Sequence, residues 1–280
     1  MSEIKLPKAA SSIQKGVPLK KVLDRPAIEQ LAINLSISYP SFRKKEFITE
    51  AMKGLQPLSL TERGKHISKV LHGFLPSNYE EAIQVILESL TPPLDQTEDN
   101  GLAPMFYMPH CNYIADYGTD PKYNDGKDPF DVSMAAQYEI TQRFTCEFSI
   151  RPFITANQDR TLEVLLQWMK DDNPHVRRLC SEGTRPRLPW SSKIQSFVDD
   201  PGPVIPILEE LKDDPVLYVR RSVANHVGDI AKDHPELAFD LCEKWLNGAS
   251  KELKWVIRHA VRNPFKKGVQ RAIDLRQAAK

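Results

Sequence analysis

The segment Asn173–Trp190 carries residues that could act on a substrate with a phosphate backbone. It reads NPHVRRLCSEGTRPRLPW and concentrates arginines around one glutamate and a terminal tryptophan. Asp172 or Asn173 could cap the start of a helix here, because both side chains accept hydrogen bonds from the first backbone amides. On that helix Arg178 and Glu182 share one face, four residues apart. The segment could hold a phosphate and present a carboxylate beside it, although a surface helix with one ion pair is equally compatible.

Arginines recur at regular intervals along the second half of the chain. Four pairs stand four positions apart: Arg143/Glu147, Arg178/Glu182, Arg221/Asn225 and Arg258/Arg262. Successive arginines are 35, 43 and 37 residues apart, a spacing typical of stacked helical hairpins. Stacking would place the second members of these pairs in one row on one face, backed by the four arginines. The row could also be a structural ladder in which each arginine pairs with the neighbouring helix.

Apolar residues recur with helical spacing in the first part of the chain. Four stripes predict short amphipathic helices within residues 28–35, 42–55, 67–74 and 82–90. The alternation typical of β-strands is absent. Residues 1–16 carry few apolar side chains, so we expect an N-terminal arm that could be disordered. Residues 91–128 are rich in proline, aspartate, asparagine and glycine, which predicts a long loop.

Two of the repeats begin alike. Asp171–Pro174 precedes one arginine-bearing helix and Asp213–Pro215 precedes the next. Repeats near 40 residues with this arrangement resemble HEAT repeats, which stack into a curved solenoid with a concave face. We therefore expect an all-α fold, a HEAT-like solenoid in which antiparallel helix pairs form a right-handed superhelix. We expect it to be a single domain over residues 17–280.

The bulk composition excludes several classes of protein. The 280 residues are 41% hydrophobic and carry a formal net charge of +1, as expected of a globular chain. The four cysteines form no CxxC pair and have no histidine at metal-ligand spacing, so we expect free thiols and no metal. No apolar run is long enough for a signal sequence or a membrane span, which favours a cytoplasmic location.

The charges are unevenly distributed. Residues 80–131 hold eleven acidic and two basic side chains, whereas residues 251–280 hold nine basic and two acidic ones. Basic residues on the concave face of a solenoid could follow a polyphosphate backbone. The predicted nucleic-acid contacts are Arg143, Arg177, Arg185, Arg187, Arg220, Arg221, Asn225, Arg258 and Arg262.

A basic groove that holds two glutamates suits an enzyme that acts on the sugar of a nucleic acid. A nucleobase that is already positively charged through alkylation is a good leaving group and needs little protonation. The enzyme must then stabilise a sugar oxocarbenium ion and position a water molecule, which two ionised carboxylates can do electrostatically. The face of Trp190 could add a cation–π attraction to the developing charge.

Three segments carry a resemblance to a known family: Val176–Trp190, Arg143–Ile154 (RFTCEFSIRPFI) and Tyr218–Pro235 (YVRRSVANHVGDIAKDHP). Together they resemble the AlkC-type DNA alkylation repair glycosylases, HEAT-like relatives of AlkD, over about residues 23–265. The resemblance implies hydrolysis of the N-glycosidic bond of 3-methyladenine, with 3-methylcytosine as a further candidate, in duplex DNA. It also implies that the base is not flipped into a pocket, unlike in conventional glycosylases, and that no cofactor takes part.

By motif position, the resemblance implies that Glu147 and Glu182 are the two acidic residues of the active site, Arg178 their supporting arginine and Trp190 the aromatic contact. No lysine stands in these motifs where a Schiff base could form, so we expect a monofunctional glycosylase.

The chain departs from some members of the family, which carry an immunoglobulin-like domain after the helical region. We expect none here, and the basic segment Lys266–Lys280 could replace it or be a solvated capping helix. We expect a monomer in the cytoplasm, associated with the nucleoid, whose partner is double-stranded DNA with alkylated bases. The alternative is a non-catalytic HEAT scaffold that binds nucleic acid or protein through its concave face.

Overall fold

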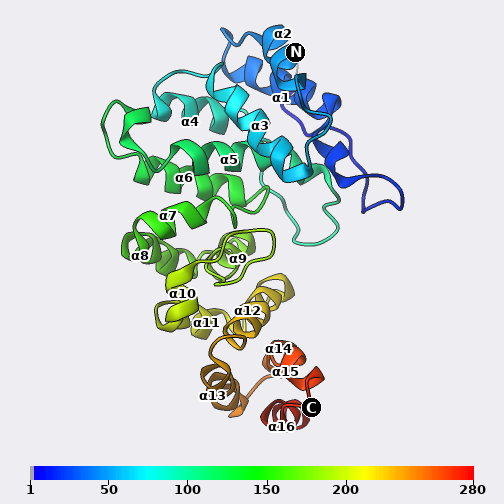
Figure 1. The fold of residues 1–280 in the computed structure, drawn as a ribbon, viewed down its shortest axis with the longest axis vertical. Coiled ribbons are helices and arrows are strands. Elements are labelled where there is room, and N and C mark those ends of the chain that lie inside the picture. The colour runs from blue at the N-terminus through cyan, green and yellow to red at the C-terminus, as the bar shows by residue number, and fades with distance from the viewer. Residues whose placement is uncertain (1–2) are drawn as a thin grey trace. The chain divides into compact units, whose positions relative to one another are not determined.

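The computed structural model describes residues 3–280, which form sixteen α-helices and four 3-10 helices and contain no β-strand (Figure 1). The prediction of an all-α fold is confirmed. The chain divides into two compact units, Met1–Phe153 and Ile154–Lys280, where the sequence predicted one domain. None of the helices in the described part of the chain is long and apolar enough to span a membrane.

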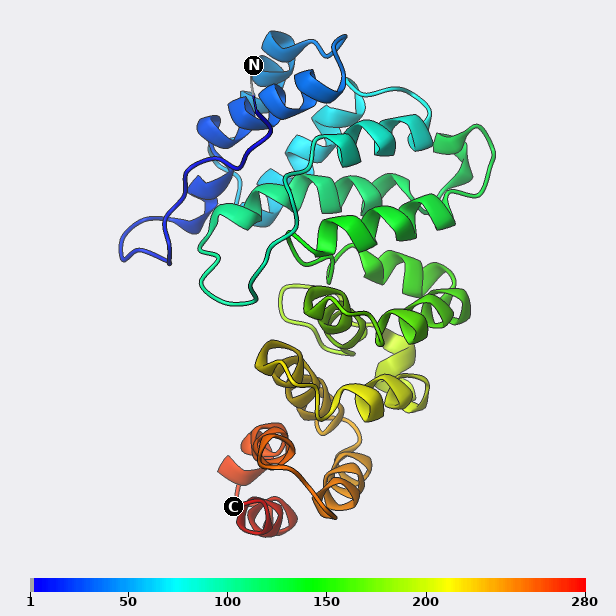
Figure 2. The same ribbon diagram turned by 180° about the vertical axis from the view of Figure 1, so that it is seen from behind.

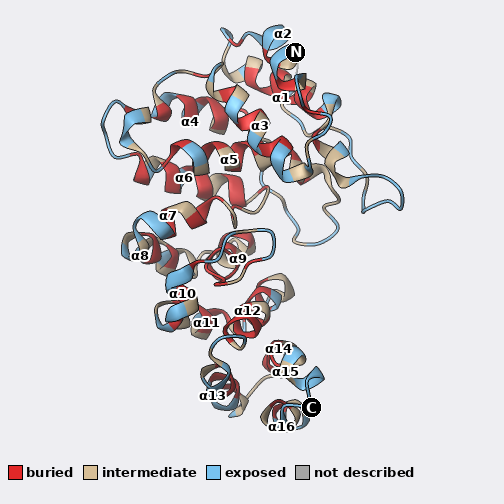
Figure 3. Ribbon diagram, in the orientation of Figure 1, coloured by how far each residue is buried: buried red, intermediate tan, exposed pale blue. Residues whose placement is uncertain are grey.

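The first unit is built from short helices joined by turns. Its elements are η1 (Leu19–Leu23), α1 (Arg25–Ser38), α2 (Lys44–Met52), α3 (Leu60–His72), α4 (Tyr79–Glu88), η2 (Ala103–Tyr107), α5 (Met108–Tyr117), η3 (Pro121–Asn124) and α6 (Phe130–Thr141). The boundary with the second unit falls within α7 (Ile150–Ala156). The four apolar stripes correspond to α1–α4, and Figure 3 shows buried residues along these helices. The prediction of four amphipathic helices is confirmed.

The prediction of a loop over residues 91–128 is wrong, because α5 lies in the middle of it and packs along α3. Its buried residues His110, Tyr113, Ile114 and Tyr117 recur at helical spacing. Irregular segments rich in proline, aspartate and glycine flank this helix on both sides. Their composition concealed a ten-residue helix that belongs to the core.

One glycine is required where α5 ends. A Cβ atom on Gly118 would lie 2.5 Å from both the hydroxyl of Tyr79 and that of Ser133, which are themselves hydrogen-bonded at 2.8 Å. A Cβ atom does not approach a non-bonded atom this closely, so any other residue would push α4 and α6 away from α5.

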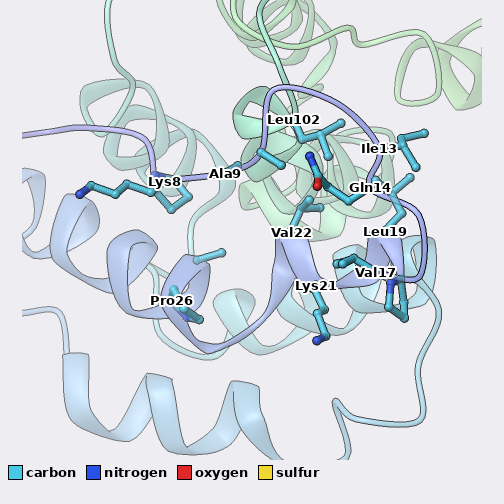
Figure 4. A pocket seen from close by; sticks show the side chains of 14 residues that line it. Lys8, Ala9, Ile13, Gln14, Val17, Leu19, Lys21, Val22, Pro26 and Leu102 are labelled. Atoms are coloured by element: carbon cyan, nitrogen blue, oxygen red, sulfur yellow. The ribbon is translucent and has the colours of Figure 1, made fainter.

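The N-terminal arm lies extended against α1 and η2. The backbone of Lys5 exchanges hydrogen bonds with the side chain of Asn34, and the amide of Leu102 donates to the carbonyl of Ala10 at 3.0 Å. The arm and η1 line a mainly apolar cavity of about 160 Å³ that is open to solvent (Figure 4). Ile13, at the edge of this cavity, is 70% exposed.

The second unit consists of helix pairs in the order predicted for repeats. Its elements are α8 (Gln158–Trp168), α9 (Pro174–Gly183), α10 (Gln195–Asp199), η4 (Gly202–Val204), α11 (Ile205–Leu211), α12 (Leu217–Ile230), α13 (Pro235–Leu246), α14 (Lys251–Ala260), α15 (Arg262–Lys266) and α16 (Gln270–Ala278). The second helices of successive pairs lie side by side, since α9 packs against α12 and α12 against α14 (Figures 1 and 2). This arrangement brings residues of α9 and α12 into one cluster.

The predicted register of four helical arginine pairs is only half correct. Arg178/Glu182 lies on α9 and Arg221/Asn225 on α12. Arg143 and Glu147 instead lie in the turns between α6 and α7, and Arg258 and Arg262 are separated by the break between α14 and α15. A spacing of four residues is common by chance, and only helical backbone on both residues places them on one face.

Candidate active site

Glu182 lies in the last turn of α9, in a buried polar cluster that α9 forms with α12. The helix starts at Asn173, whose side chain accepts a hydrogen bond from the amide of His175 at 2.9 Å. Only 5% of Glu182 is exposed. Its Oε1 lies 2.6 Å from Nη1 of Arg185 and 3.6 Å from Nη2 of Arg178. Its Oε2 lies 2.6 Å from the hydroxyl of Ser222 on α12.

These contacts keep Glu182 ionised at neutral pH. Burial acts to raise its pKa, because a charged carboxylate loses its hydration. The positive charges of Arg178 and Arg185 and the hydrogen bond from Ser222 outweigh burial, so the pKa lies below the usual value for glutamate. The second unit therefore holds a buried side chain that is negatively charged at neutral pH.

Arg185 connects Glu182 to a second buried carboxylate, Asp229 of α12. Its Nε and Nη2 lie 2.8 and 2.7 Å from Oδ2 of Asp229, while Nη1 donates to Glu182. Asp229 also accepts from Nζ of Lys232 at 2.8 Å. Burial acts to lower the pKa of Arg185, but the charges of both carboxylates raise it above the usual arginine value. Arg185 was predicted as a nucleic-acid contact, and the structure shows it buried between two carboxylates instead.

Arg178, one turn earlier on α9, also faces the carboxylate of Glu182. Its guanidinium carbon lies 4.7 Å from the ring centre of Tyr218, at the start of α12, in a cation–π contact. Stacking on the ring fixes the plane of the guanidinium while one edge faces Glu182. The ion pair predicted for this helix is therefore present, but it is one part of a larger cluster.

Trp190 lies in the loop that follows α9. It is 81% exposed, so it does not cover the core. Its φ of +63° lies in the left-handed region, which costs a non-glycine residue about 1–2 kcal/mol. Backbone hydrogen bonds from Ser191 to Leu188 and from Ile194 to Pro186 hold the loop. A large exposed aromatic ring on a strained backbone is a candidate for contact with a ligand.

Glu147 lies in the first unit, in the turns before α7, and is half-buried. Its Oε2 accepts a hydrogen bond from the hydroxyl of Thr145 at 2.9 Å, and its amide donates back to that hydroxyl at 3.3 Å. The neighbouring Cys146 is fully buried, with its Sγ 3.7 Å from Sγ of Cys111, and all four cysteines are free thiols. The structure describes Glu147 and Glu182 each within its own unit, so their action as a pair stays a prediction.

Four further arginines of the predicted nucleic-acid surface have partners within the protein. Arg143 is buried and donates to the carbonyls of Thr91 and Glu139 and to the Glu139 carboxylate. Arg220 is also buried, and its Nη1 donates to the carbonyl of Asp214. We therefore infer that the side chains of Arg143 and Arg220 stabilise the fold and do not contact DNA.

The other two arginines form bidentate ion pairs. Nε and Nη2 of Arg177 lie 2.6 and 3.0 Å from the carboxylate of Asp214, in the turn before α12. Nε and Nη2 of Arg187 lie 2.5 and 2.6 Å from the carboxylate of Asp233. Arg177 and Asp214 thus join two successive repeats, although Arg177 is not one of the four arginines for which a structural ladder was considered.

The remaining predicted contacts surround Asn225 on α12. Its Oδ1 accepts from Nη2 of Arg262 at 2.9 Å and lies 3.2 Å from Nε2 of His259. Burial and the charges of Arg262, Arg221 and Arg276 lower the pKa of His259 to about 4, so the ring is neutral at pH 7. Arg221 is exposed, and Arg258 donates to the carbonyl of Ala279. This C-terminal cluster keeps a net positive charge.

One arginine of the basic tail is neutralised by carboxylates of the preceding repeat. Arg271 on α16 forms ion pairs with Glu236, Asp240 and Glu243 of α13. The reading of the segment Lys266–Lys280 as a capping helix agrees with these contacts, which attach α16 to the preceding repeat.

Comparison with known proteins shows two extensive similarities. No family model matches the chain. The uncharacterized protein YhaZ of Bacillus subtilis strain 168 is 37% identical over 258 residues, which are 92% of this chain and 67% of YhaZ. The structure of the Pseudomonas fluorescens alkylpurine DNA glycosylase AlkC, bound to DNA containing an abasic site analog, matches with a TM-score of 0.82 and 37% identity, over 93% of this chain and 68% of that one.

The match to AlkC confirms the predicted helical-repeat fold. AlkD2 from Streptococcus mutans matches with 19% identity and a TM-score of only 0.42, over 86% of this chain and 97% of that one.

Proposed function

Because the chain belongs to the AlkC family of alkylpurine DNA glycosylases, we propose that it removes alkylated bases from DNA by hydrolysing the N-glycosidic bond. The observation that supports this most directly is Glu182, a buried carboxylate held ionised beside Arg178, on the motif that carries the family resemblance. The proposed substrates are bases that alkylation has made cationic, 3-methyladenine first and 3-methylcytosine second, in duplex DNA and without base flipping.

The proposed chemistry needs negative charge more than it needs a proton donor. A cationic base leaves without being protonated, and positive charge develops on the deoxyribose. A carboxylate that is already ionised and fixed in place stabilises that charge with little reorganisation. We assign this role to Glu182, with Glu147 as the second carboxylate and with water as the nucleophile.

Two further residues complete the proposed site. Arg178 contacts the carboxylate of Glu182 and fixes its position. Trp190 offers an exposed ring whose face attracts a cation. The product is an abasic site in an uncut strand, since the mechanism does not require an amine nucleophile.

The proposed partner is double-stranded DNA, bound through its phosphates. Arg221, Arg262 and Arg258 of the C-terminal cluster, with Asn225, remain the proposed phosphate contacts, and Arg177, Arg185, Arg187, Arg220 and Arg143 are not among them. We propose that the protein acts as a monomer on the nucleoid in the cytoplasm.

The test is release of bases from methylated duplex DNA by the purified protein, with the products identified by chromatography. Glu182→Gln and Glu147→Gln keep the size of the side chain but remove its charge, and each is expected to lower the rate about a hundredfold to a thousandfold. Glu163→Gln, which changes an exposed carboxylate on α8, is the matched control and should release bases like the wild type.

Each contrary outcome has a separate meaning. Full activity of both glutamine variants would show that the carboxylates do not act as proposed. Binding of DNA by the wild type without release of any base would favour the non-catalytic scaffold. Thermal unfolding of each variant is recorded alongside, because Glu182 also stabilises the second unit.

A further inference from the structure

The two oxygens of Glu182 have different partners. The inference drawn below from this difference rests on the proposed function. Oε1 faces the guanidinium groups of Arg185 and Arg178 at 2.6 and 3.6 Å. Oε2 faces the hydroxyl of Ser222 at 2.6 Å. One oxygen is thus paired with cations and the other with a neutral donor.

Ser222 has a defined donor direction. Its hydroxyl has one hydrogen and lies close to two acceptors, Oε2 of Glu182 at 2.6 Å and the hydroxyl of Ser181 at 3.0 Å. A carboxylate is the stronger acceptor and the distance to it is shorter, so Ser222 donates to Glu182. The hydroxyl of Ser181 can then donate to Ser222. Both serines are almost fully buried, so bulk water does not reach them.

Without the hydroxyl of Ser222, the carboxylate of Glu182 could pair with an arginine in a different geometry. A carboxylate beside arginines readily forms a bidentate pair in which both oxygens bind one guanidinium. Such a pair would neutralise both oxygens of Glu182. The hydrogen bond from α12 holds Oε2 away from the cations, so Oε2 keeps its negative charge without an ion pair.

We propose that Ser222 is a positioning residue of the glycosylase, which fixes the carboxylate of Glu182 so that Oε2 is directed by a hydroxyl and not by an arginine. Ser222 is 2% exposed, so it acts through Glu182 and not by touching DNA. Ser181 supports it by orienting its hydroxyl.

The electrostatic consequence depends on all the groups around the carboxylate. These are Arg178 on the same helix, Arg185 in the following loop, and Asp229 on α12, which acts through Arg185. His226 on α12 lies nearby, with its Nδ1 3.0 Å from the backbone carbonyl of Ser181. The hydrogen bond from Ser222 contributes to the low pKa of Glu182. Its removal therefore raises the pH at which Glu182 takes up a proton.

The experiment compares Ser222→Ala with the wild type in single-turnover release of 3-methyladenine from duplex DNA between pH 3 and pH 8, with spontaneous release subtracted at each pH. We expect the rate at neutral pH to fall about tenfold, as for loss of one hydrogen bond to a charged group. The midpoint of the acidic limb should move to higher pH. Affinity for duplex DNA with an abasic-site analogue should stay within about twofold of the wild type, since a buried hydroxyl makes no DNA contact.

Matched variants separate positioning from packing. Ser222→Thr keeps the hydroxyl and should restore the wild-type midpoint. Ser68→Ala removes a buried hydroxyl in α3 that makes no hydrogen bond, so it controls for the loss of a buried serine hydroxyl as such. Its rate and midpoint should equal those of the wild type.

An unchanged rate and midpoint in Ser222→Ala would overturn the proposal, as would a threonine variant that behaves like the alanine variant while remaining folded. If Ser222→Ala does not fold, Ser181→Ala takes its place, and an unmoved midpoint there would overturn the proposal. A wild-type protein that releases no base would instead contradict the proposed function itself.

Discussion

At the scale of the residue, Glu182 shows how a buried charge can be both stable and available. Removing a carboxylate from water costs several kcal/mol unless partners compensate. Arg178, Arg185 and Ser222 provide that compensation with three separate donors. Since the donors are already in place, little free energy is needed to orient dipoles when a positive charge forms on the sugar.

Trp190 has an exposed ring and a left-handed backbone, and neither feature stabilises the fold. Trp190→Gly would remove the ring and relieve the left-handed backbone, while glycine gains entropy in the unfolded chain. We expect the free energy of unfolding to change by less than about 1 kcal/mol. The rate of base release should fall about tenfold through loss of the cation–π contact.

Trp190→Ala separates the two effects, because alanine keeps the strained φ and loses only the ring. It should lose activity like the glycine variant and be the less stable of the two in urea unfolding. Wild-type activity in both variants would remove Trp190 from the proposed site.

At the scale of the element, the active-site cluster depends on how α9 and α12 pack. Asp214, in the turn before α12, accepts from Arg177 of α9 through both oxygens, and its Oδ1 also accepts from the amide of Val216 at 2.8 Å. Nη1 of Arg177 donates to the carbonyls of Asp171 and Asp172. One arginine thus joins two successive repeats and sets the separation at which Ser222 meets Glu182.

Arg177→Ala should therefore destabilise the protein and leave its DNA contacts intact. Asp214 would remain buried without its partner, which typically costs about 3–5 kcal/mol. Urea unfolding measures this loss. Arg187→Ala is the comparison, since its partner Asp233 is more exposed and the loss should be clearly smaller. Weaker DNA binding by Arg177→Ala with unchanged stability would return Arg177 to the DNA surface.

The same elements show what could be predicted from the sequence. The stripes of α1–α4 and the repeated aspartate–proline turns identified helices and repeats, because periodicity and capping are local, whereas the family was identified from three sequence motifs. Local patterns did not identify α5, and they placed Arg143 and Glu147 on a helix that does not exist. Ser222 could not be predicted, since a serine on a helix has no distinguishing signal until packing brings it to a carboxylate of the previous repeat.

At the scale of the whole molecule, each of the two units has its own buried core and its own buried polar groups. In the first unit His110 is fully buried against Phe106 and Tyr107, and neither ring nitrogen has a hydrogen-bond partner among the described residues. Burial lowers the pKa of His110 to about 3. The ring is neutral in the folded protein at any pH at which the enzyme is expected to work.

This histidine makes stability depend on pH. The unfolded chain takes up a proton near pH 6.5 and the folded protein does not, so this contribution is complete above pH 6.5 and is lost as the pH falls. Between pH 6.5 and pH 5 the loss should be about 2 kcal/mol, at roughly 1.4 kcal/mol per pH unit. His110→Leu should flatten this dependence in urea unfolding. An identical slope in the variant would show that His110 is not the source.

Because several arginines are paired within the protein, the affinity of the proposed DNA complex should depend less on salt. Each phosphate neutralised by a protein cation releases condensed counterions from the duplex, which makes binding weaker as the salt concentration rises. Arg143, Arg177, Arg185, Arg187 and Arg220 already have partners within the protein. Few ions are then released per complex, and affinity should decline with salt less steeply than the number of arginines in the sequence suggests. Such a protein could search and repair DNA over a wide range of ionic strength.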